Sequence, residues 1–252
     1  MDLFDSHCHY NDEKFDEDRD EIIKQNFKEI SNAVVAGYNL EGSKKAIEIA
    51  KKYERIYATV GISPNDVCEN FDYTEIEKLA KHPKVVAIGE IGLDYYWNKE
   101  NKELQKDTFI KQIQIANKLD LPIVIHTREA VMDTLEILKQ NPVNKKGIFH
   151  CCPLNVELIK EAIKLGFYIS FSGNITFKNA KNAITCIEAV PLEKQLIETD
   201  SPYMTPEPHR GERNTPANVK YVAEKIADTH GHEIEEIAEI TAQNAKRIFQ
   251  IK

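Results

Sequence analysis

Histidines and carboxylates, side chains that bind divalent metal ions, recur beside the short apolar runs of this sequence. The first run ends with His7 and His9, which are separated by one residue. In an extended strand these two side chains point to the same face and lie about 6–7 Å apart along the strand, so two imidazoles can share one metal ion. A His-x-His pair is also common by chance, so the pair alone is weak evidence for a metal site.

Four further metal-binding side chains accompany later apolar runs. Glu90 is a carboxylate inside an otherwise apolar run, and His126, His150 and Asp200 each lie at or just after the end of another run. Taken singly, Glu90 could pair with a buried Lys or Arg, and each histidine is more commonly an ordinary polar residue. Four histidines and two carboxylates together are a chemically sensible ligand set for a pair of divalent ions.

Eight runs rich in apolar and β-branched residues predict the strands that must position these side chains. The runs are residues 2–9, 31–38, 56–62, 85–93, 121–126, 147–150, 167–171 and 195–198. Continuous apolar runs are typical of strands covered on both faces, as in a parallel sheet. Amphipathic segments lie between them. Residues 104–119 have apolar side chains at helical spacing, Asn155 can cap a helix that ends near Gly166, and residues 234–248 form a last amphipathic helix.

The alternation of predicted strands and helices indicates an α/β protein with a single (β/α)8 barrel (TIM barrel) domain over residues 1–252, since this fold typically needs about 250 residues. An open, doubly wound sheet is the alternative, but no GxGxxG or GxxxxGK[ST] turn follows any predicted strand. In a barrel the C-terminal ends of the strands converge on one face, where active sites form. We therefore expect the metal-binding side chains to gather into one site there.

The composition is that of an ordinary globular protein, with 42% hydrophobic and 29% charged residues. The first residues lack the pattern of a secretory signal, and no apolar run approaches the roughly 18 residues of a membrane span, so we expect a cytoplasmic protein without membrane association. The net charge of −8 disfavours binding of nucleic acid through a broad basic surface. It does not exclude an enzyme that grips a few phosphates locally.

The cysteines predict no disulfide framework. There are five of them, an odd number, and they contain no CxxC pair. Although some lie beside candidate metal-binding histidines, we expect all of them to be small buried thiols. They are Cys8, Cys68, Cys151, Cys152 and Cys186.

Five segments closely resemble the TatD-type deoxyribonucleases, a family of the amidohydrolase superfamily. They are residues 4–9 (FDSHCH), 89–96 (GEIGLDYY), 122–128 (PIVIHTR), 198–203 (ETDSPY) and 210–216 (RGERNTP). As an ordered set they are far more specific than the His-x-His pair. The resemblance implies a metal-dependent hydrolase with deoxyribonuclease or 3′–5′ exonuclease activity on the phosphodiester bonds of DNA, with single strands or DNA ends as the substrate.

The same resemblance implies a cofactor of two divalent ions per chain, with zinc, manganese, magnesium and iron all compatible with the ligands. It also implies a role for each metal-binding residue. One ion would be held by His7, His9 and Asp200, the other by His126 and His150, and Glu90 would bridge them. A water molecule held by the metal ions titrates at about pH 7. Asp200 would lie beside this water and is therefore also the candidate general base.

Three arginines are candidate contacts for substrate phosphates: Arg128, Arg210 and Arg213. A guanidinium matches phosphate with paired donors and stays charged. In the alternative interpretation, Arg210 and Arg213 form salt bridges with Glu207 and Glu212 and merely order their loop.

Tyr95 is the candidate contact for a nucleobase, together with Tyr96 and Trp97, which follow it. Stacking on a base contributes about 1–3 kcal/mol in proteins that bind single strands. Packing of the three rings within their own loop is an equally good interpretation of the sequence.

The sequence departs from the family pattern after the third predicted strand. Many members have a Gly-x-His-Pro-His turn there, but residues 61–66 read GISPND, so Ser63 and Asn65 replace both histidines. Neither residue titrates near pH 7, although both can donate hydrogen bonds to phosphate. We expect the metal site to be kept and the substrate contacts on this side to differ.

Two alternative functions remain compatible with these residues. The same ligands could serve the hydrolysis of another ester or amide, including an aminoacyl-tRNA, because a fold does not fix a substrate. A non-catalytic protein that keeps its metal ions as a structural clamp is the second alternative. A monomer is plausible in either case.

Overall fold

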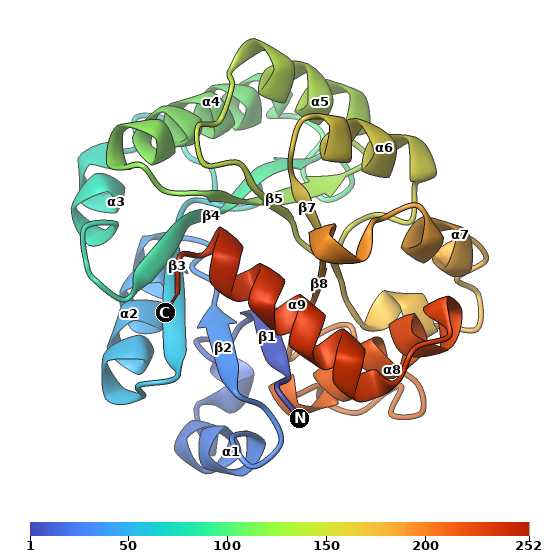
Figure 1. Ribbon diagram of the computed structural model, residues 1–252. Coiled ribbons are helices and arrows are strands. Elements are labelled where there is room, and N and C mark those ends of the chain that lie inside the picture. The colour runs from blue at the N-terminus through green and yellow to red at the C-terminus, as the bar shows by residue number, and fades with distance from the viewer. Residues whose placement is uncertain (252) are drawn as a thin grey trace.

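The structure, a computed structural model, describes residues 1–251. Within this range the chain forms eight β-strands and nine α-helices (Figure 1). The strands are β1 (Phe4–Cys8), β2 (Asn32–Val35), β3 (Ile56–Val60), β4 (Val85–Asp94), β5 (Ile123–Arg128), β6 (Gly147–Phe149), β7 (Tyr168–Phe171) and β8 (Gln195–Ile197). The α-helices are α1 (Arg19–Asn26), α2 (Leu40–Lys52), α3 (Tyr73–Leu79), α4 (Lys102–Leu119), α5 (Val131–Gln140), α6 (Val156–Lys164), α7 (Ala183–Glu188), α8 (Val219–His230) and α9 (Ile234–Ile248).

The strands form one parallel sheet in the order β1 to β8, with helices on its outer side (Figure 1). The sheet closes where the chain beyond β8 meets β1. The backbone N–H of Asp200 donates to the carbonyl of His7 at 3.0 Å, and that of His9 donates to the carbonyl of Ser201 at 2.7 Å. The predicted (β/α)8 barrel is therefore confirmed, and the open doubly wound sheet is excluded.

The predicted elements are present with small shifts at their ends. The first strand, predicted over residues 2–9, spans Phe4–Cys8. The helix predicted over residues 104–119 begins slightly earlier, at Lys102. Asn155 caps α6 as expected, because its side chain accepts a hydrogen bond from the backbone N–H of Leu158 at 3.0 Å. These agreements show that the alternation of apolar runs and amphipathic segments determines the architecture.

Apolar side chains fill one end of the barrel, and α9 closes that end. A buried cluster combines residues from β1, β2 and β4 to β8 with residues of α9 and its end. Its members are Phe4, Val34, Val86, Ala87, Val124, Ile148, Tyr168, Leu196, Ala242, Ala245, Ile248 and Phe249. Most of the strand residues lie near the starts of their strands, and α9 crosses the barrel in Figure 1. The C-terminal end is thereby left to polar groups.

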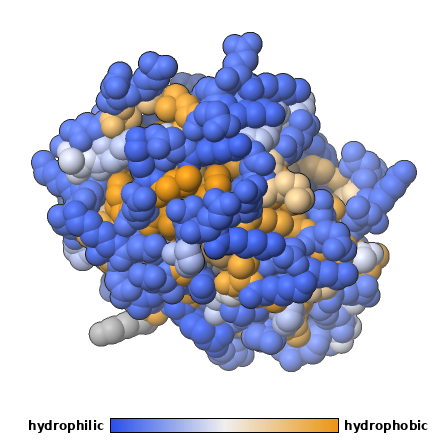
Figure 2. Space-filling model, turned by 90° about the horizontal axis from the view of Figure 1, so that it is seen from above, coloured by the Kyte–Doolittle hydropathy of each residue, from blue (hydrophilic) through white to orange (hydrophobic). Residues whose placement is uncertain are grey.

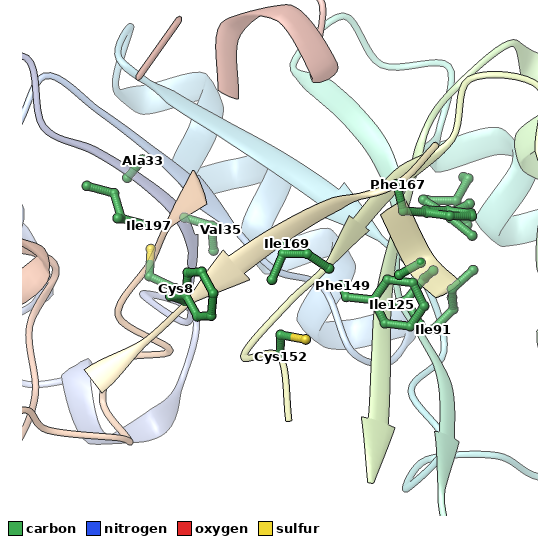
Figure 3. Packing of buried hydrophobic residues seen from close by; sticks show 14 of the residues in the cluster. Cys8, Ala33, Val35, Ile91, Ile125, Phe149, Cys152, Phe167, Ile169 and Ile197 are labelled. Atoms are coloured by element: carbon green, nitrogen blue, oxygen red, sulfur yellow. The ribbon is translucent and has the colours of Figure 1, made fainter. Parts of the chain in front are cut away.

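A larger apolar cluster lies between the strands and the surrounding helices. Figure 3 shows Cys8 and Cys152 among the aliphatic and aromatic side chains of this cluster. Cys186 is buried as well, so these three cysteines are the buried thiols that we expected. The expectation is wrong for Cys68, which is exposed in the loop before α3, and for Cys151, which is half-buried just after β6. All five cysteines are free.

The surface agrees with the polar composition of the chain. The face drawn in Figure 2 is mostly hydrophilic, with hydrophobic residues in a patch near its centre. Among residues 1–251, no helix combines the length and the apolar character needed to cross a membrane.

Candidate metal centre

His7 and His9 converge at the C-terminal end of β1 because the pairing of this strand is irregular. The register between β1 and β2 shifts between Asp5 and Cys8. Phe4 accordingly belongs to the cluster inside the barrel, whereas Cys8 belongs to the cluster outside it. Such irregularities redirect side chains and are common beside active sites. Both imidazoles are buried, and their Nε2 atoms lie 3.2 Å apart.

Glu90 reaches the same place from the middle of β4, where two glycines allow a close approach to β5. A Cβ atom at Gly89 would lie 2.6 Å from the Cβ of Val124. Gly92 has a φ of +140°, and a Cβ atom there would overlap the carbonyl oxygen of His126. The glycines of the GEIGLD segment therefore serve the contact of β4 with β5 and bring Glu90 next to His126.

The carboxylate of Glu90 lies between two pairs of histidines. Its Oε2 is 3.6 Å from Nε2 of His7 and 3.9 Å from Nε2 of His9. Its Oε1 is 2.9 Å from Nδ1 of His126 and 3.3 Å from Nε2 of His150. Each oxygen of one carboxylate thus faces one pair, which is the arrangement expected of a bridging ligand.

Asp200 completes the group from the segment after β8. Its Oδ1 lies 3.2 Å from Nε2 of His9 and 3.8 Å from Nε2 of His7. The backbone of Asp200 is left-handed, with a φ of +54°, a conformation that Asp tolerates better than most residues. The preceding Thr199 is anchored to Asp5, which accepts hydrogen bonds from the backbone N–H and the hydroxyl of Thr199 at 3.0 and 2.6 Å. This anchor holds the backbone next to Asp200 against β1.

Two further buried carboxylates hold the outer nitrogens of His126 and His150. Oδ2 of Asp94 lies 2.9 Å from Nε2 of His126, and Oε1 of Glu198 lies 3.3 Å from Nδ1 of His150. Glu198 also accepts a hydrogen bond from the backbone N–H of Cys151 at 2.6 Å. Asp94 and Glu198 lie in two of the family segments, residues 89–96 and 198–203, but the sequence assigned neither of them a role. Their position beside candidate ligands in two of the motifs was the available signal.

The histidines and carboxylates shift one another's pKa values in opposite directions. Burial disfavours the charged form of Glu90, but the charge of His150 and hydrogen bonds from the surrounding histidines hold its pKa well below its usual range. Burial also opposes protonation of His150, but the charge of Glu90 and the contact with Glu198 raise its pKa well above the ordinary value. For His7, burial and the charge of His150 prevail and lower the pKa. The protonation of each of these residues therefore depends on the charges of the others.

The donor set fits divalent metal ions. A divalent ion bound at about 2.0–2.2 Å by nitrogen and oxygen keeps neighbouring ligand atoms roughly 3 Å apart. The six residues form three overlapping groups in which donor atoms lie within 4.8 Å of one another. In addition, Nε2 of His7 and Nε2 of His9 lie 3.2 Å apart, and each lies close to a carboxylate oxygen, that of Glu90 at 3.6 Å and that of Asp200 at 3.2 Å. Imidazoles and carboxylates are the ligands that zinc, manganese and iron accept.

The candidate phosphate contacts differ in their surroundings. The guanidinium of Arg128 lies over the ring of Tyr96 at 3.9 Å and faces Trp97 at 5.5 Å. Tyr95 differs from its neighbours: its ring is buried and its hydroxyl donates to Asp133 at 2.7 Å, so it presents no free face for stacking. The exposed aromatic surface beside Arg128 belongs to Tyr96 and Trp97 instead.

The arginines after β8 are held by other parts of the chain. Arg213 pairs with Asp18 at 2.6 Å and also donates to the carbonyl of Lys14. Arg210 donates to the carbonyl of Thr205 at 2.7 Å. Neither arginine pairs with Glu207 or Glu212, so the salt bridges of the alternative interpretation are wrong. Arg213 nevertheless has the ordering role that this alternative described.

Ser63 and Asn65 lie beside the donor set, in the loop after β3. The hydroxyl of Ser63 donates to Asp66 at 2.7 Å, and Nδ2 of Asn65 donates to Oδ2 of Asp94 at 3.4 Å. Both residues line a groove of about 730 Å³ that is also lined by His9 and Glu90. The residues that replace the family histidines therefore face the centre without displacing any of its donors.

An eight-stranded parallel barrel with histidines and carboxylates gathered at its C-terminal end is the architecture of the metal-dependent hydrolases of the amidohydrolase superfamily. Residues 4–250 match the sequence profile described as "TatD related DNase", and the chain belongs to this family.

Its relatives and structural neighbours agree with this assignment. YabD of Bacillus subtilis, described as a metal-dependent hydrolase, is 44% identical over 253 residues, which is 99% of either chain. YcfH of Escherichia coli K12, described in the same terms, is 38% identical over 256 residues and covers 100% of this chain and 97% of its own. The crystal structure of the TatD homologue YJJV of E. coli K12 superposes with a TM-score of 0.93 at 24% identity, covering 99% of this chain and 98% of that one. That likeness shows the shared fold.

Proposed function

We propose that this hydrolase is a deoxyribonuclease that cleaves phosphodiester bonds with the help of two divalent metal ions, acting as a 3′–5′ exonuclease on single strands or DNA ends. The division of the four histidines between the two oxygens of Glu90 carries the proposal. It supports one ion held by His7, His9 and Asp200 and another held by His126 and His150, with Glu90 shared. The family name supports DNA as the substrate.

Two bound divalent ions would acidify a water molecule and neutralise the charge of the phosphate that it attacks. The residues of the chain supply the rest. Asp200 is the better placed carboxylate to accept the proton of that water, because its side chain is 17% exposed against 10% for Glu90. The pKa of Glu90 lies well below its usual range, since the charge and hydrogen bonds of the histidines outweigh its burial, so Glu90 remains ionised at neutral pH.

The rim around Arg128 is suited to the strand that carries the phosphates. Arg128 is fixed by its stacking on Tyr96, and the exposed Trp97 lies next to it. A guanidinium and an aromatic face together can contact one phosphate and one unpaired base. A duplex would need a broad basic surface, which a chain with a net charge of −8 does not favour.

The direct test is the degradation of 5′-labelled single-stranded DNA after chelator treatment and addition of Mg²⁺, Mn²⁺ or Zn²⁺. We expect the wild type to release nucleotides stepwise and Glu90→Ala to lose at least about a thousandfold in rate, or roughly 4 kcal/mol of barrier. Asp200→Asn should lose activity as well. Glu224→Ala, which removes an exposed glutamate of α8, is the matched control and should cleave like the wild type.

The outcome against the proposal is equally specific. A wild-type protein that binds two metal ions per chain and cuts no DNA would exclude the nuclease function while leaving the hydrolase intact. A panel of carboxylic esters, including aminoacyl esters, would then be the next substrate class to assay.

A further inference from the structure

Two glutamines of α4, Gln105 and Gln112, are fully buried although their side chains are polar. Oε1 of Gln112 accepts a hydrogen bond from the backbone N–H of Ile62 at 2.8 Å, and its Nε2 donates to the carbonyl of the same residue at 2.9 Å. Gln105 binds the backbone of Asp94 in the same way, at 2.8 and 3.1 Å. Each side chain therefore satisfies both backbone polar groups of one residue at the C-terminal end of the barrel.

The backbone of Asp94 needs such a partner because β4 is longer than its neighbour β3. The pairing of β3 with β4 ends at Ile88, whereas β4 continues to Asp94 and stays paired with β5 to its end. Beyond Ile88, the side of β4 that faced β3 is an edge, and the backbone N–H and C=O groups of a buried edge need other partners. The amide of Gln105 supplies both partners for Asp94, in place of the missing strand.

Gln105 holds the loop between β4 and α4 as well. Its Nε2 also donates to the carbonyl of Asn98 at 2.8 Å and to Oδ1 of Asn101 at 2.9 Å. Asn98 lies in this loop, and Asn101 directly precedes α4. The amide of Gln105 therefore joins the end of β4, the loop and the start of α4 into one hydrogen-bonded unit.

Asp94 connects this unit to the metal centre. Its carboxylate is fully buried, and Oδ2 lies 2.9 Å from Nε2 of His126, a candidate ligand. Its Oδ1 accepts hydrogen bonds from the backbone N–H groups of Tyr96 and Trp97 at 2.9 Å. These contacts orient the carboxylate, whereas Gln105 fixes the backbone that carries it. A carboxylate in this position orients the imidazole and strengthens its binding to a metal ion.

We infer that Gln105 is a positioning residue of the metal centre, which holds the backbone of Asp94 so that its carboxylate meets His126. The inference rests on the metal site of the proposed function and is independent of DNA as the substrate. Gln105 contacts neither a candidate ligand nor the reacting atoms and acts through Asp94. Loss of its amide should therefore weaken the binding of the ion held by His126 more than the binding of the other ion.

The test compares Gln105→Met with Gln112→Met, because methionine is also unbranched but makes none of the amide hydrogen bonds. Each variant leaves one buried backbone N–H and one C=O without a partner, so the Tm of the metal-free protein should fall by a similar amount in both. Calorimetric titration of the chelator-treated protein with Zn²⁺ should separate them. Gln105→Met should weaken one zinc-binding step about three- to tenfold, less than the 10–100-fold expected when a carboxylate partner is lost.

Gln112→Met should leave both zinc-binding steps unchanged. Ile62, which Gln112 holds, carries no donor to a candidate ligand, and the nearby Asn65 lies 3.4 Å from Oδ2 of Asp94, a long contact. Should Gln105→Met fail to fold, Gln105→Glu and Gln112→Glu replace the two methionine variants. They keep the acceptor for the backbone N–H and lose the donor to the carbonyl.

A double variant shows whether Gln105 acts through Asp94. Asp94→Asn removes the anionic partner of His126 and so identifies the zinc-binding step concerned. If Gln105 serves to place this carboxylate, adding Gln105→Met to Asp94→Asn should weaken that step by less than about twofold. Independent effects would instead multiply.

The results that would overturn the inference differ from those that would overturn the metal centre. Unchanged zinc binding by Gln105→Met, with a lower Tm, would make Gln105 a purely structural residue. Equal weakening of zinc binding by Gln105→Met and Gln112→Met would indicate a general loosening of the barrel. Effects that multiply in the double variant would show that Gln105 does not act through Asp94. A wild-type protein that binds no zinc would overturn the metal centre itself.

Discussion

The two pairs of histidines around Glu90 contain the same kind of side chain but are supported differently. His126 and His150 each have a buried carboxylate against the nitrogen that points away from Glu90, Asp94 in one case and Glu198 in the other. The corresponding Nδ1 atoms of His7 and His9 have no hydrogen-bond partner within residues 1–251, although both are buried. One half of the centre is therefore fixed in tautomer and orientation, whereas the other relies on packing.

This difference predicts an order of metal binding. A carboxylate behind a ligating imidazole raises its basicity and fixes the ring, and such partners change metal affinity about 10–100-fold. We therefore expect an ion held by His126 and His150 to bind first and to be the last that a chelator removes. An ion held by His7, His9 and Asp200 should exchange more readily.

The largest effect on this asymmetry should come from the supporting carboxylates. Asp94→Asn or Glu198→Gln should weaken the tighter of two metal-binding steps about 10–100-fold, because the imidazole loses its anionic partner. The weaker step should change little, so the two steps become alike. Calorimetric titration with Zn²⁺ or Mn²⁺ measures both steps, and Asp107→Asn is the control on the surface. Two steps that weaken equally would refute the division into halves.

The dependence of the protein's stability on pH should reverse sign when the metal ions are removed. Burial opposes protonation of His9 and His126, but the hydrogen bonds that their imidazoles donate to Asp200 and Asp94 raise their pKa values, and the pKa of His150 is raised further. When the folded-state pKa of a histidine is raised, its protonation stabilises the folded protein. This stabilisation is complete below the unfolded pKa of about 6.5 and is lost as the pH rises through the raised folded-state pKa. Metal binding requires these protons to leave, so it strengthens as the pH rises.

The measurement is thermal unfolding at pH 6 and pH 8, with and without chelator. The Tm of the metal-free protein should be lower at pH 8 than at pH 6, whereas the Tm of the metal-loaded protein should not fall between these two pH values. At more acidic pH, as the pH falls below the ordinary glutamate value of 4.5, the low pKa of Glu90 acts in the other direction and stability falls with acid, because the charge and hydrogen bonds of the histidines hold this pKa down against burial. A metal-free Tm that rises from pH 6 to pH 8 would contradict the assignment of protons to the histidines.

The smallest effect is expected from Trp97, whose backbone N–H bonds to Asp94 while its ring is exposed. Oδ1 of Asp94 accepts hydrogen bonds from the backbone N–H groups of Tyr96 and Trp97 at 2.9 Å, while its Oδ2 supports His126. Trp97→Ala keeps these backbone groups and removes only the exposed ring. We expect both metal-binding steps to be unchanged and the affinity for single-stranded DNA to fall about fivefold, or about 1 kcal/mol, as measured by fluorescence anisotropy. Altered metal binding would show that the ring itself supports the centre.

The sequence predicted the parts of this molecule that depend on local pattern. Continuous apolar runs gave the eight strands, and the convergence of strand ends in a barrel placed His7, Glu90 and Asp200 together although they are far apart in the chain. Convergence follows from topology alone, so no side-chain detail was needed. The resemblance to the family then identified which six polar residues to group.

The features that were missed depend on which atom of a side chain meets which partner. Arg213 pairs with Asp18, which is distant in sequence and not in its own loop, so local acidic residues gave the wrong partner. Tyr95 is buried whereas Trp97, two residues later, is exposed, and nothing in the sequence distinguishes these two aromatic residues. Besides Glu90, the carboxylates that line the groove come from the segments after β1 and β3 and from α2, so their gathering appears only when these elements are assembled.

The position of α9 has a consequence for how the protein is made. The side chains of the metal centre all lie before residue 201, whereas the apolar end of the barrel needs Ala242, Ala245 and Ile248 from α9 to be covered. A ribosome adds residues in order, so the barrel interior stays open to water until this helix emerges. A chain that stops near residue 233 would carry every metal-binding residue and still expose Phe4 and Val124, the surface that chaperones bind and that aggregates.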